Sequence, residues 1–259
     1  MEKPIVELIN VSARYGSILA LEDISLSVYA QDFLGVFGPN GGGKSTLLKL
    51  LLGLVAPSTG SIRILGRSPC QVRRRLGYVP QHSEVNRNFP ASVLDLVLMG
   101  SLPQTPHPFF GFRHKEREKA RESLATMGIK GLETRLLSQL SGGQLQRALI
   151  ARTLMNQPDV ILLDEPTASV DTETKQTIYA LLQRLRQGGT TVLIVSHDTA
   201  ALAPYVSRVA CLNRTLHYHG DWPTNNEAVA EAFGCSVEMA MSAFRSGSIT
   251  TQEAGEGGA

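Results

Sequence analysis

The chain has 259 residues, of which 42% are hydrophobic and 19% are charged, so it can bury the core of one large globular domain or of two modest ones. Its 25 Lys and Arg residues nearly balance its 23 Asp and Glu residues, and the net charge therefore offers no argument for a nucleic-acid partner. The sequence has no signal-peptide core and no window of the roughly 18 apolar residues that span a bilayer, so we expect a cytoplasmic protein that reaches a membrane only through a partner.

The first third of the chain is typical of strands. Residues 5–16 and 24–38 mix β-branched residues with alternating polar ones, which predicts an antiparallel edge sheet leading into a buried strand. After Gly43 the leucine spacing changes to that of a helix, which we expect to end near Gly53.

The stretch "GPNGGGKST" lies between this buried strand and this helix and fits G-x-x-x-x-G-K-[ST] in full. Its glycines let backbone N–H groups turn inward around phosphates. Lys44 is predicted to bridge the β- and γ-phosphates, and Ser45 to supply an oxygen to Mg²⁺. The predicted phosphate-binding residues are Gly38, Pro39, Asn40, Gly41, Gly42, Gly43, Lys44, Ser45 and Thr46.

Residues 83–157 change in composition and predict an inserted helical subdomain, with helices over residues 92–102 and 115–129. Near its end, "LSGGQLQRALIART" sets Ser141, Gly142 and Gly143 ahead of an amphipathic run, as at a helix N-terminus that holds an anion. A capped helix start alone would account for Ser141 but not for two consecutive glycines, which weaken a helix by about 1 kcal/mol each.

Strands and helices then alternate again over residues 159–198, which predicts a parallel sheet covered on both faces. The apolar strand "VILLDEP" delivers Asp164 and Glu165 to the carboxyl edge of that sheet. Asp164 suits a Mg²⁺ site, and Glu165 can polarise an attacking water. The last residues, 246–259, lack any apolar period and predict a disordered tail.

Five motifs in this order, namely the phosphate loop, "YVPQ", "LSGGQ", "LLDEP" with "TASVD", and "IVSHD", make the chain resemble the ATP-binding cassette (ABC) family from about Ile5 to Gly220. The resemblance implies an α/β P-loop NTPase fold with a RecA-like parallel core sheet, an antiparallel β subdomain and an inserted helical subdomain. It divides the chain into a nucleotide-binding core (1–82 and 158–220), a helical subdomain (83–157), a C-terminal extension (221–245) and the tail (246–259).

The resemblance also implies roles for single residues. Tyr15 stacks on adenine, Gln81 reaches Mg²⁺ and the attacking water, and His197 touches the γ-phosphate and holds Glu165. The catalytic residues it implies are Glu165, His197, Gln81 and Lys44, and the Mg²⁺ ligands are Ser45, Gln81 and Asp164. Asp171 would lie at the contact between two cassettes, although an Asp before "TET" can equally cap a helix.

The resemblance further implies a head-to-tail homodimer with two ATP molecules between the chains. Each "LSGGQ" segment, represented by Ser141, Gly142, Gly143 and Gln144, would complete the ATP site of the other chain. Hydrolysis would then loosen the dimer, because the γ-phosphate that both chains bind is lost.

Residues 78–100, 149–171 and 209–220 resemble the ATPase subunits of bacterial zinc and manganese uptake systems. This implies a partner permease in the membrane, an extracytoplasmic metal-binding protein and a place on the cytoplasmic face of the membrane. An ATPase for another cargo, such as an iron chelate or haem, and a non-transport cassette stay open as alternatives. His217 and His219 are too few for a Zn²⁺ site, and we interpret them as surface histidines.

Overall fold

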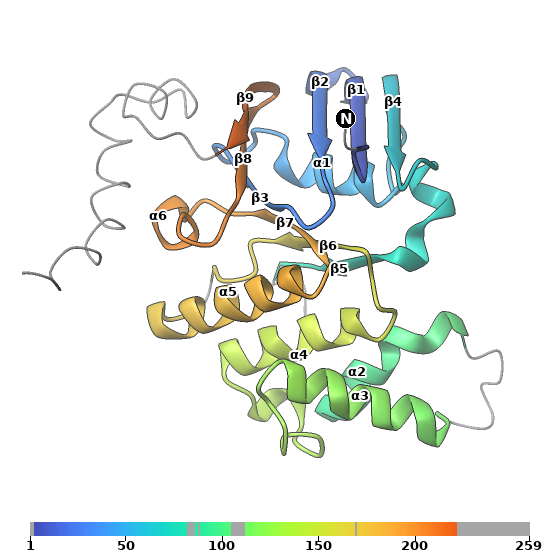
Figure 1. Cartoon of the computed structure of the whole chain (residues 1–259), viewed down its shortest axis with the longest axis vertical. Helices are drawn as coiled ribbons and strands as arrows, with labels where there is room; N and C mark the ends of the chain where they lie inside the picture. Colours follow the sequence, from blue (N-terminus) through green and yellow to red (C-terminus); the bar gives the residue numbers. More distant parts are fainter. Residues whose placement is uncertain (1–2, 82–85, 88, 105–111, 169, 222–259) are drawn as a thin grey trace, which may run out of the picture.

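The computed structural model describes residues 3–81, 86–87, 89–104, 112–168 and 170–221, and two sheets organise it (Figure 1). The smaller sheet is antiparallel, with strand order β2-β1-β4. Its strands are β1 (Val6–Tyr15), β2 (Ile18–Val28) and β4 (Thr59–Ile64). This sheet confirms the antiparallel β subdomain predicted from the first third of the sequence.

The larger sheet has the strand order β5-β6-β7-β3-β8-β9. Its first five strands pair in parallel, and β9 closes the edge as an antiparallel hairpin with β8. In spatial order the strands are β5 (Leu76–Val79), β6 (Val160–Asp164), β7 (Thr191–Val195), β3 (Phe33–Phe37), β8 (Arg208–Asn213) and β9 (Thr215–Asp221). The predicted parallel sheet is thereby confirmed.

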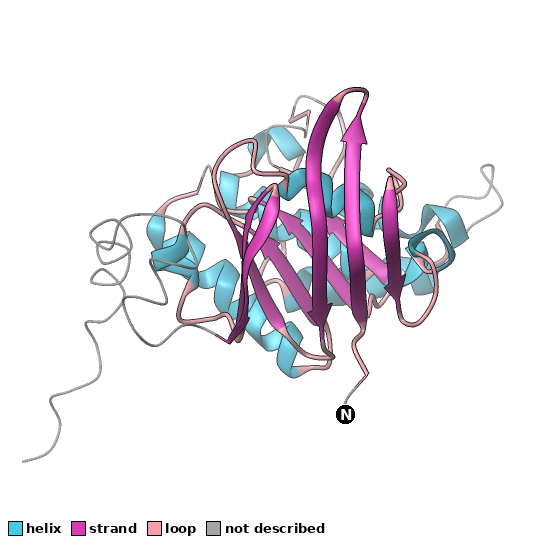
Figure 2. Ribbon diagram, turned by 90° about the horizontal axis from the view of Figure 1, so that it is seen from above, coloured by secondary structure: helices cyan, strands magenta, loops and turns pink. Residues whose placement is uncertain are grey.

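Both faces of the larger sheet are covered, as the apolar runs of its strands predicted (Figure 2). In β6, Val160 and Leu162 pack into one hydrophobic cluster with helix α1 (Lys44–Leu51) and the antiparallel sheet. Ile161 and Leu163 point the opposite way, into a second cluster with the remaining helices. Full burial of such a side chain stabilises the fold by about 1.5–3 kcal/mol, so the two clusters hold the sheet from both sides.

The second cluster is built mainly by helices. The helices besides α1 are α2 (Val93–Leu98), α3 (His114–Thr126), α4 (Gly142–Leu154), α5 (Thr172–Gln187) and α6 (Thr199–Leu202). Short 3₁₀ turns are η1 (Pro69–Gln71), η2 (Arg73–Arg75), η4 (Met99–Gln104) and η5 (Leu137–Gln139). α2, α3 and α4 pack on one another, and α5 lies between α4 and the sheet (Figure 1).

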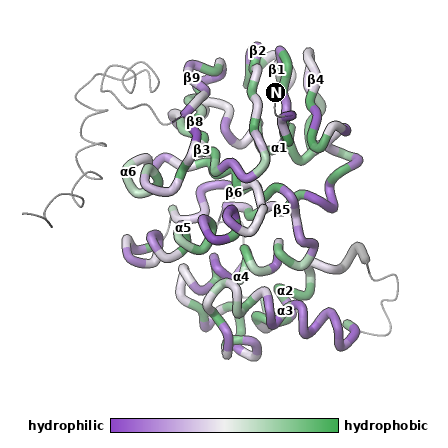
Figure 3. The backbone as a smooth tube through the Cα atoms, viewed as in Figure 1, coloured by the Kyte–Doolittle hydropathy of each residue, from purple (hydrophilic) through white to green (hydrophobic). Residues whose placement is uncertain are grey.

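Helix α3 carries most of its charge on the outside of the molecule. Figure 3 shows it as predominantly hydrophilic, and only Ala120, Ser123 and Leu124 of this helix are buried. No helix in the described part of the chain is both long and apolar enough to cross a bilayer. The predicted C-terminal extension, apart from its first residue, and the predicted tail lie outside the described residues.

The two histidines of β9 differ in their surroundings, which corrects the interpretation that both are surface residues. His217 is exposed, but His219 is half-buried, and its Nε2 is buried with no hydrogen-bond partner among the described residues. Burial and, second, the charge of Arg208 lower the pKa of His219 to about 4, against a hydrogen bond to the backbone of Ser27 that raises it. The neutral imidazole is therefore the form that the fold accommodates.

This pKa predicts acid sensitivity. Between pH 6.5 and about pH 4 the unfolded chain binds a proton at His219 that the folded chain does not, so stability falls as the pH falls through this window. Between pH 7 and pH 4.5 we expect the free energy of unfolding to fall by about 1–2 kcal/mol less in His219→Leu than in the wild type. This value is reduced to allow for the partial solvent exposure of His219. Urea unfolding at both pH values measures the difference. His217→Leu is the exposed control, and equal losses in all three proteins would contradict the prediction.

Candidate functional site

The phosphate loop joins the end of β3 to the start of α1, and its path requires glycine at defined positions. Gly38 has φ +154°, and a Cβ there would lie 1.9 Å from the carbonyl oxygen of Leu212 in β8. Gly43 has φ +93° and serves as N-cap of α1 without a side-chain cap. The first N–H groups of α1 therefore have no side-chain acceptor, as an anion-binding helix start requires.

Lys44 begins α1 and is 6% exposed. Its Nζ donates to the carbonyl oxygens of Gly38 at 2.8 Å and Pro39 at 2.9 Å, two acceptors within the loop itself. Burial lowers the pKa of Lys44, while the charges of Glu165 and Asp164 raise it. The Lys44 ammonium group is thus bound to carbonyl oxygens of its own loop.

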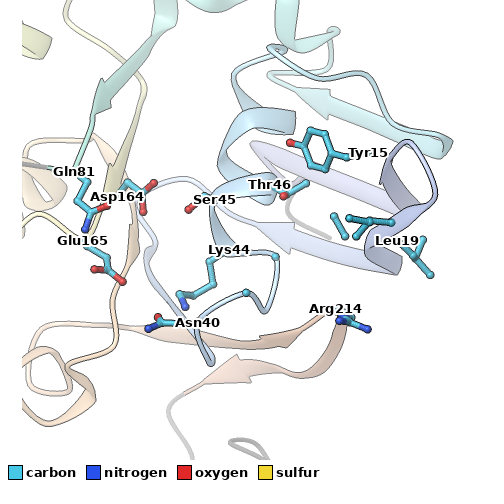
Figure 4. Close-up of a pocket in the computed structure, with 14 residues that line it drawn as sticks. Tyr15, Leu19, Asn40, Lys44, Ser45, Thr46, Gln81, Asp164, Glu165 and Arg214 are labelled. Carbon is cyan, nitrogen blue, oxygen red and sulfur yellow. The ribbon is translucent and has the colours of Figure 1, made fainter. Parts of the chain in front are cut away.

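A cleft of about 440 Å³ opens over this loop and gathers most of the predicted site (Figure 4). The predicted residues that line it are Tyr15, Asn40, Gly41, Gly43, Lys44, Ser45, Thr46, Gln81, Asp164 and Glu165. Ile18, Leu19, Ala20 and Arg214 also line it and were not singled out from the sequence. Gly38, Pro39 and Gly42 shape the loop but are not among the lining residues.

The acidic end of the cleft is held by two adjacent strands. Asp164 ends β6 and pairs in register with Val195 of β7, and the backbone N–H of Glu165 donates to the Val195 carbonyl at 3.0 Å. Glu165 has φ +44°, a left-handed conformation that is uncommon for a residue other than glycine. Such strain is found at functional sites, and here it occurs at the candidate base.

His197 follows β7 and contacts the same carboxylate. Its Nδ1 lies 3.4 Å from Oε1 of Glu165, with the imidazole 59% exposed and the carboxylate 17% exposed. His197 does not line the cleft, so the structure brings it to Glu165 rather than to the phosphate loop. Glu165 is thus held at its backbone by the bond to Val195, and its carboxylate has the His197 ring beside it.

The signature segment lies outside the chain's own cleft. Ser141 is the N-cap of α4, where its Oγ accepts from the Gln144 N–H at 3.2 Å and its N–H donates to Oε1 of Gln144 at 3.0 Å. This capping box uses both side chains locally. None of Ser141, Gly142, Gly143 and Gln144 lines the cleft over the phosphate loop, and α4 lies on the opposite side of the sheet from α1 (Figure 1).

Packing against another helix explains why residue 143 is glycine, and the sequence did not reveal this contact. A Cβ at this position would lie 2.1 Å from Cγ2 of Thr174, in the first turn of α5. Asp171 is the N-cap of α5, and its Oδ1 accepts from the Thr174 N–H at 2.9 Å. This hydrogen bond lowers the pKa of Asp171. The close contact between α4 and α5 is thus sufficient to require glycine at position 143. Asp171 caps a helix, which is the alternative role that the sequence allowed.

Comparisons with known proteins agree with this geometry. A family model described as "ABC transporter" matches residues 21–168. The chain is 41% identical over 226 residues to the manganese transport system ATP-binding protein MntB of Bacillus subtilis, covering 85% of this chain and 87% of the relative. It is 40% identical over 240 residues to the zinc transport system ATP-binding protein TroB of Treponema pallidum, covering 91% and 89%.

The fold also matches solved structures. The dimeric post-hydrolysis state of the ATP-binding cassette MJ0796, bound to ADP and phosphate, superimposes with a TM-score of 0.72 at 29% identity, covering 85% of this chain and 100% of that chain. The likeness to a cassette that holds a nucleotide agrees with a cleft built over a phosphate loop.

The contact between Gly143 and Thr174 predicts an unusual sign for a helix substitution. Ala in place of Gly normally stabilises a helix by up to about 1 kcal/mol. Here we expect Gly143→Ala to lower the free energy of unfolding by about 1–3 kcal/mol, because the new methyl meets Cγ2 of Thr174. Thr174→Ser removes that methyl and should restore most of the loss in the double variant. Urea unfolding of the four proteins gives the coupling, and additive effects would contradict the contact.

Proposed function

The chain belongs to the ABC transporter family and is an ATPase, and we propose that it is the subunit that powers the import of manganese or zinc through a separate permease. The observation that carries the ATPase part is the cleft in which the phosphate loop, Gln81 and the Asp164–Glu165 pair meet. The metal part rests on the relatives, which are named as manganese and zinc transport ATP-binding proteins.

We infer that ATP lies along the cleft with its base at Tyr15 and its γ-phosphate at the acidic end. Tyr15 is 42% exposed and lines the cleft, so its ring is available for stacking. The backbone amides at the start of α1 bind the phosphate oxygens. The Lys44 ammonium group, which otherwise donates to the carbonyl oxygens of Gly38 and Pro39, then donates to the β- and γ-phosphates.

Mg²⁺ fits the donor set at the phosphate end of the cleft. The Ser45 hydroxyl, the Gln81 amide and the Asp164 carboxylate supply oxygens, the ligand type that this ion prefers, and all three line the cleft. When bound, the ion neutralises charge that builds up on the β- and γ-phosphates.

Glu165 is the proposed base for hydrolysis. It accepts a proton from a water that attacks the γ-phosphorus, while the bond from phosphorus to the bridging oxygen breaks and ADP leaves. His197 holds this carboxylate in place from 3.4 Å and reaches toward the γ-phosphate. Gln81 helps to orient the water.

The ATP site is proposed to be completed by a second copy of the chain. Ser141, Gly142, Gly143 and Gln144 stand at the N-terminus of α4, outside the cleft of their own chain, where the positive helix end can meet a γ-phosphate of the other chain. We propose that Asp171, the N-cap of the neighbouring helix α5, lies at the same interface. The solved MJ0796 cassette, which is a dimer, supports this arrangement.

We also propose the division of the chain and its place in the cell, which rest on the family to which the chain belongs. Residues 83–157 form the helical subdomain, and residues 1–82 with 158–220 form the nucleotide-binding core. The subunit lies on the cytoplasmic face of the membrane, bound to the permease, while an extracytoplasmic protein delivers the metal. No nucleic acid takes part.

Glu165→Gln tests the ATPase and transport roles together in the complex with its permease. Because Gln cannot accept the proton from water, we expect ATP turnover and metal uptake into vesicles to fall at least 100-fold, with ATP binding retained. Uptake of Mn²⁺ and Zn²⁺ by the wild-type complex is the reference. Wild-type uptake of an iron chelate or haem, with neither metal carried, would overturn the metal assignment. Near-normal turnover in the variant would remove Glu165 from its role.

Mixed dimers test the contribution of the signature segment to the other chain's site. Pairing Ser141→Arg with Lys44→Ala leaves one site intact if ATP lies between the phosphate loop of one chain and the signature of the other, because both changes then fall on the second site. We expect the mixed dimer to retain ATP hydrolysis at one site while either variant homodimer has lost it. A mixed dimer as inactive as the two homodimers would contradict the proposal.

A further inference from the structure

Arg214 lies at the turn between β8 and β9, where its backbone is tied to two parts of the candidate site. Its N–H donates to the Gly42 carbonyl of the phosphate loop at 2.9 Å, and its carbonyl accepts from the Glu22 N–H of β2 at 2.8 Å. The turn is therefore bonded to the phosphate loop and to β2, the strand whose residues Ile18, Leu19 and Ala20 line the cleft.

The side chain of Arg214 is exposed and lines the cleft. Figure 4 shows it toward the end that holds Tyr15 and Leu19, and well separated from Gln81, Asp164 and Glu165 at the other end. Among the described residues that line the cleft, only Lys44 and Arg214 are cations. Within the described part of the chain, no hydrogen bond or ion pair engages the guanidinium group of Arg214, whereas the Lys44 ammonium is bound to loop carbonyls.

The backbone conformation does not explain why this residue is arginine. Arg214 has φ +60°, in the left-handed region where Gly and Asn are favoured and a long side chain brings no advantage. Nor does a core contact explain it, because the residue is exposed. The one feature that distinguishes Arg here is a permanent, planar positive charge directed at the cleft, which suits phosphate oxygens.

We propose that Arg214 is a further nucleotide-binding residue, and that its guanidinium contacts the α-phosphate beside the ribose. This inference rests on the proposed function, because it assumes that ATP lies along the cleft with its base at Tyr15. The α-phosphate is present in both ATP and ADP, and the position of Arg214 away from the carboxylates separates it from the reacting γ-phosphate. Its contribution is therefore to hold the nucleotide through the whole cycle and not to accelerate hydrolysis.

The test compares Arg214→Gln, which removes the charge at similar length, with Arg214→Lys, which keeps it. Arg74→Gln is the matched control, because Arg74 is an exposed arginine of η2 that does not line the cleft. Calorimetry on the full chain with Mg-ATP and with Mg-ADP, at fixed ionic strength, gives the dissociation constants. Steady-state kinetics give KM and kcat, and thermal unfolding reports on the fold.

We expect Arg214→Gln to raise the dissociation constants for ATP and ADP alike, by roughly 5- to 20-fold. KM for ATP should rise accordingly, and kcat should change little. Arg214→Lys should recover part of the affinity, and Arg74→Gln should bind as the wild type does. Unchanged affinity in Arg214→Gln, or a loss for ATP only, would overturn the proposal. Equal losses in the Gln and Lys variants with a lowered unfolding temperature would assign Arg214 a structural role instead. Absence of ATP binding by the wild type would refute the proposed function itself.

Discussion

The parallel pairing of β5, β6, β7 and β3 is the constraint on which the rest of this structure depends. Parallel strands end at one edge of a sheet, so the segments that follow them meet there. Lys44 follows β3, Asp164 ends β6, His197 follows β7, and Gln81 follows β5. Lys44, Asp164 and Gln81 thereby line one cleft, and His197 contacts Glu165 beside them. A slip of one strand against its neighbour would displace its side chain from the other three.

The two hydrophobic clusters keep that edge in place. Successive residues of the buried strands alternate between the cluster beneath the antiparallel sheet and the cluster beneath the helices. The phosphate loop is fixed from a third side, because Gly38 and Gly42 pack against the carbonyl of Leu212. The same hairpin that supports the loop carries Arg214 into the cleft, so support of the loop and the lining of the cleft come from one element.

The segment after Glu165 leads from the acidic end of the cleft to helix α5, which contacts the signature helix α4. It runs from the strained Glu165 to the cap at Asp171, and the first turn of α5 then presses Thr174 against Gly143. The N-terminus of α4 is therefore in contact with the first turn of α5, although it lies outside the chain's own cleft. In the proposed dimer this contact would link the two ATP sites, since each signature segment serves the other chain.

The sequence by itself determined those features of this protein that arise from residues adjacent along the chain. A glycine-rich turn between an apolar strand and a leucine-spaced helix specifies the phosphate loop, and an apolar strand ending in Asp164 specifies the acidic edge, because these signals are local. Only the tertiary structure decided what surrounds Gly143, His219 and Arg214. Gly143 meets a residue of another helix, His219 is half-buried near the charge of Arg208, and Arg214 lines a cleft formed by residues from distant strands. These surroundings depend on distances between segments that are remote in the sequence, and such distances cannot be derived from the order of the residues.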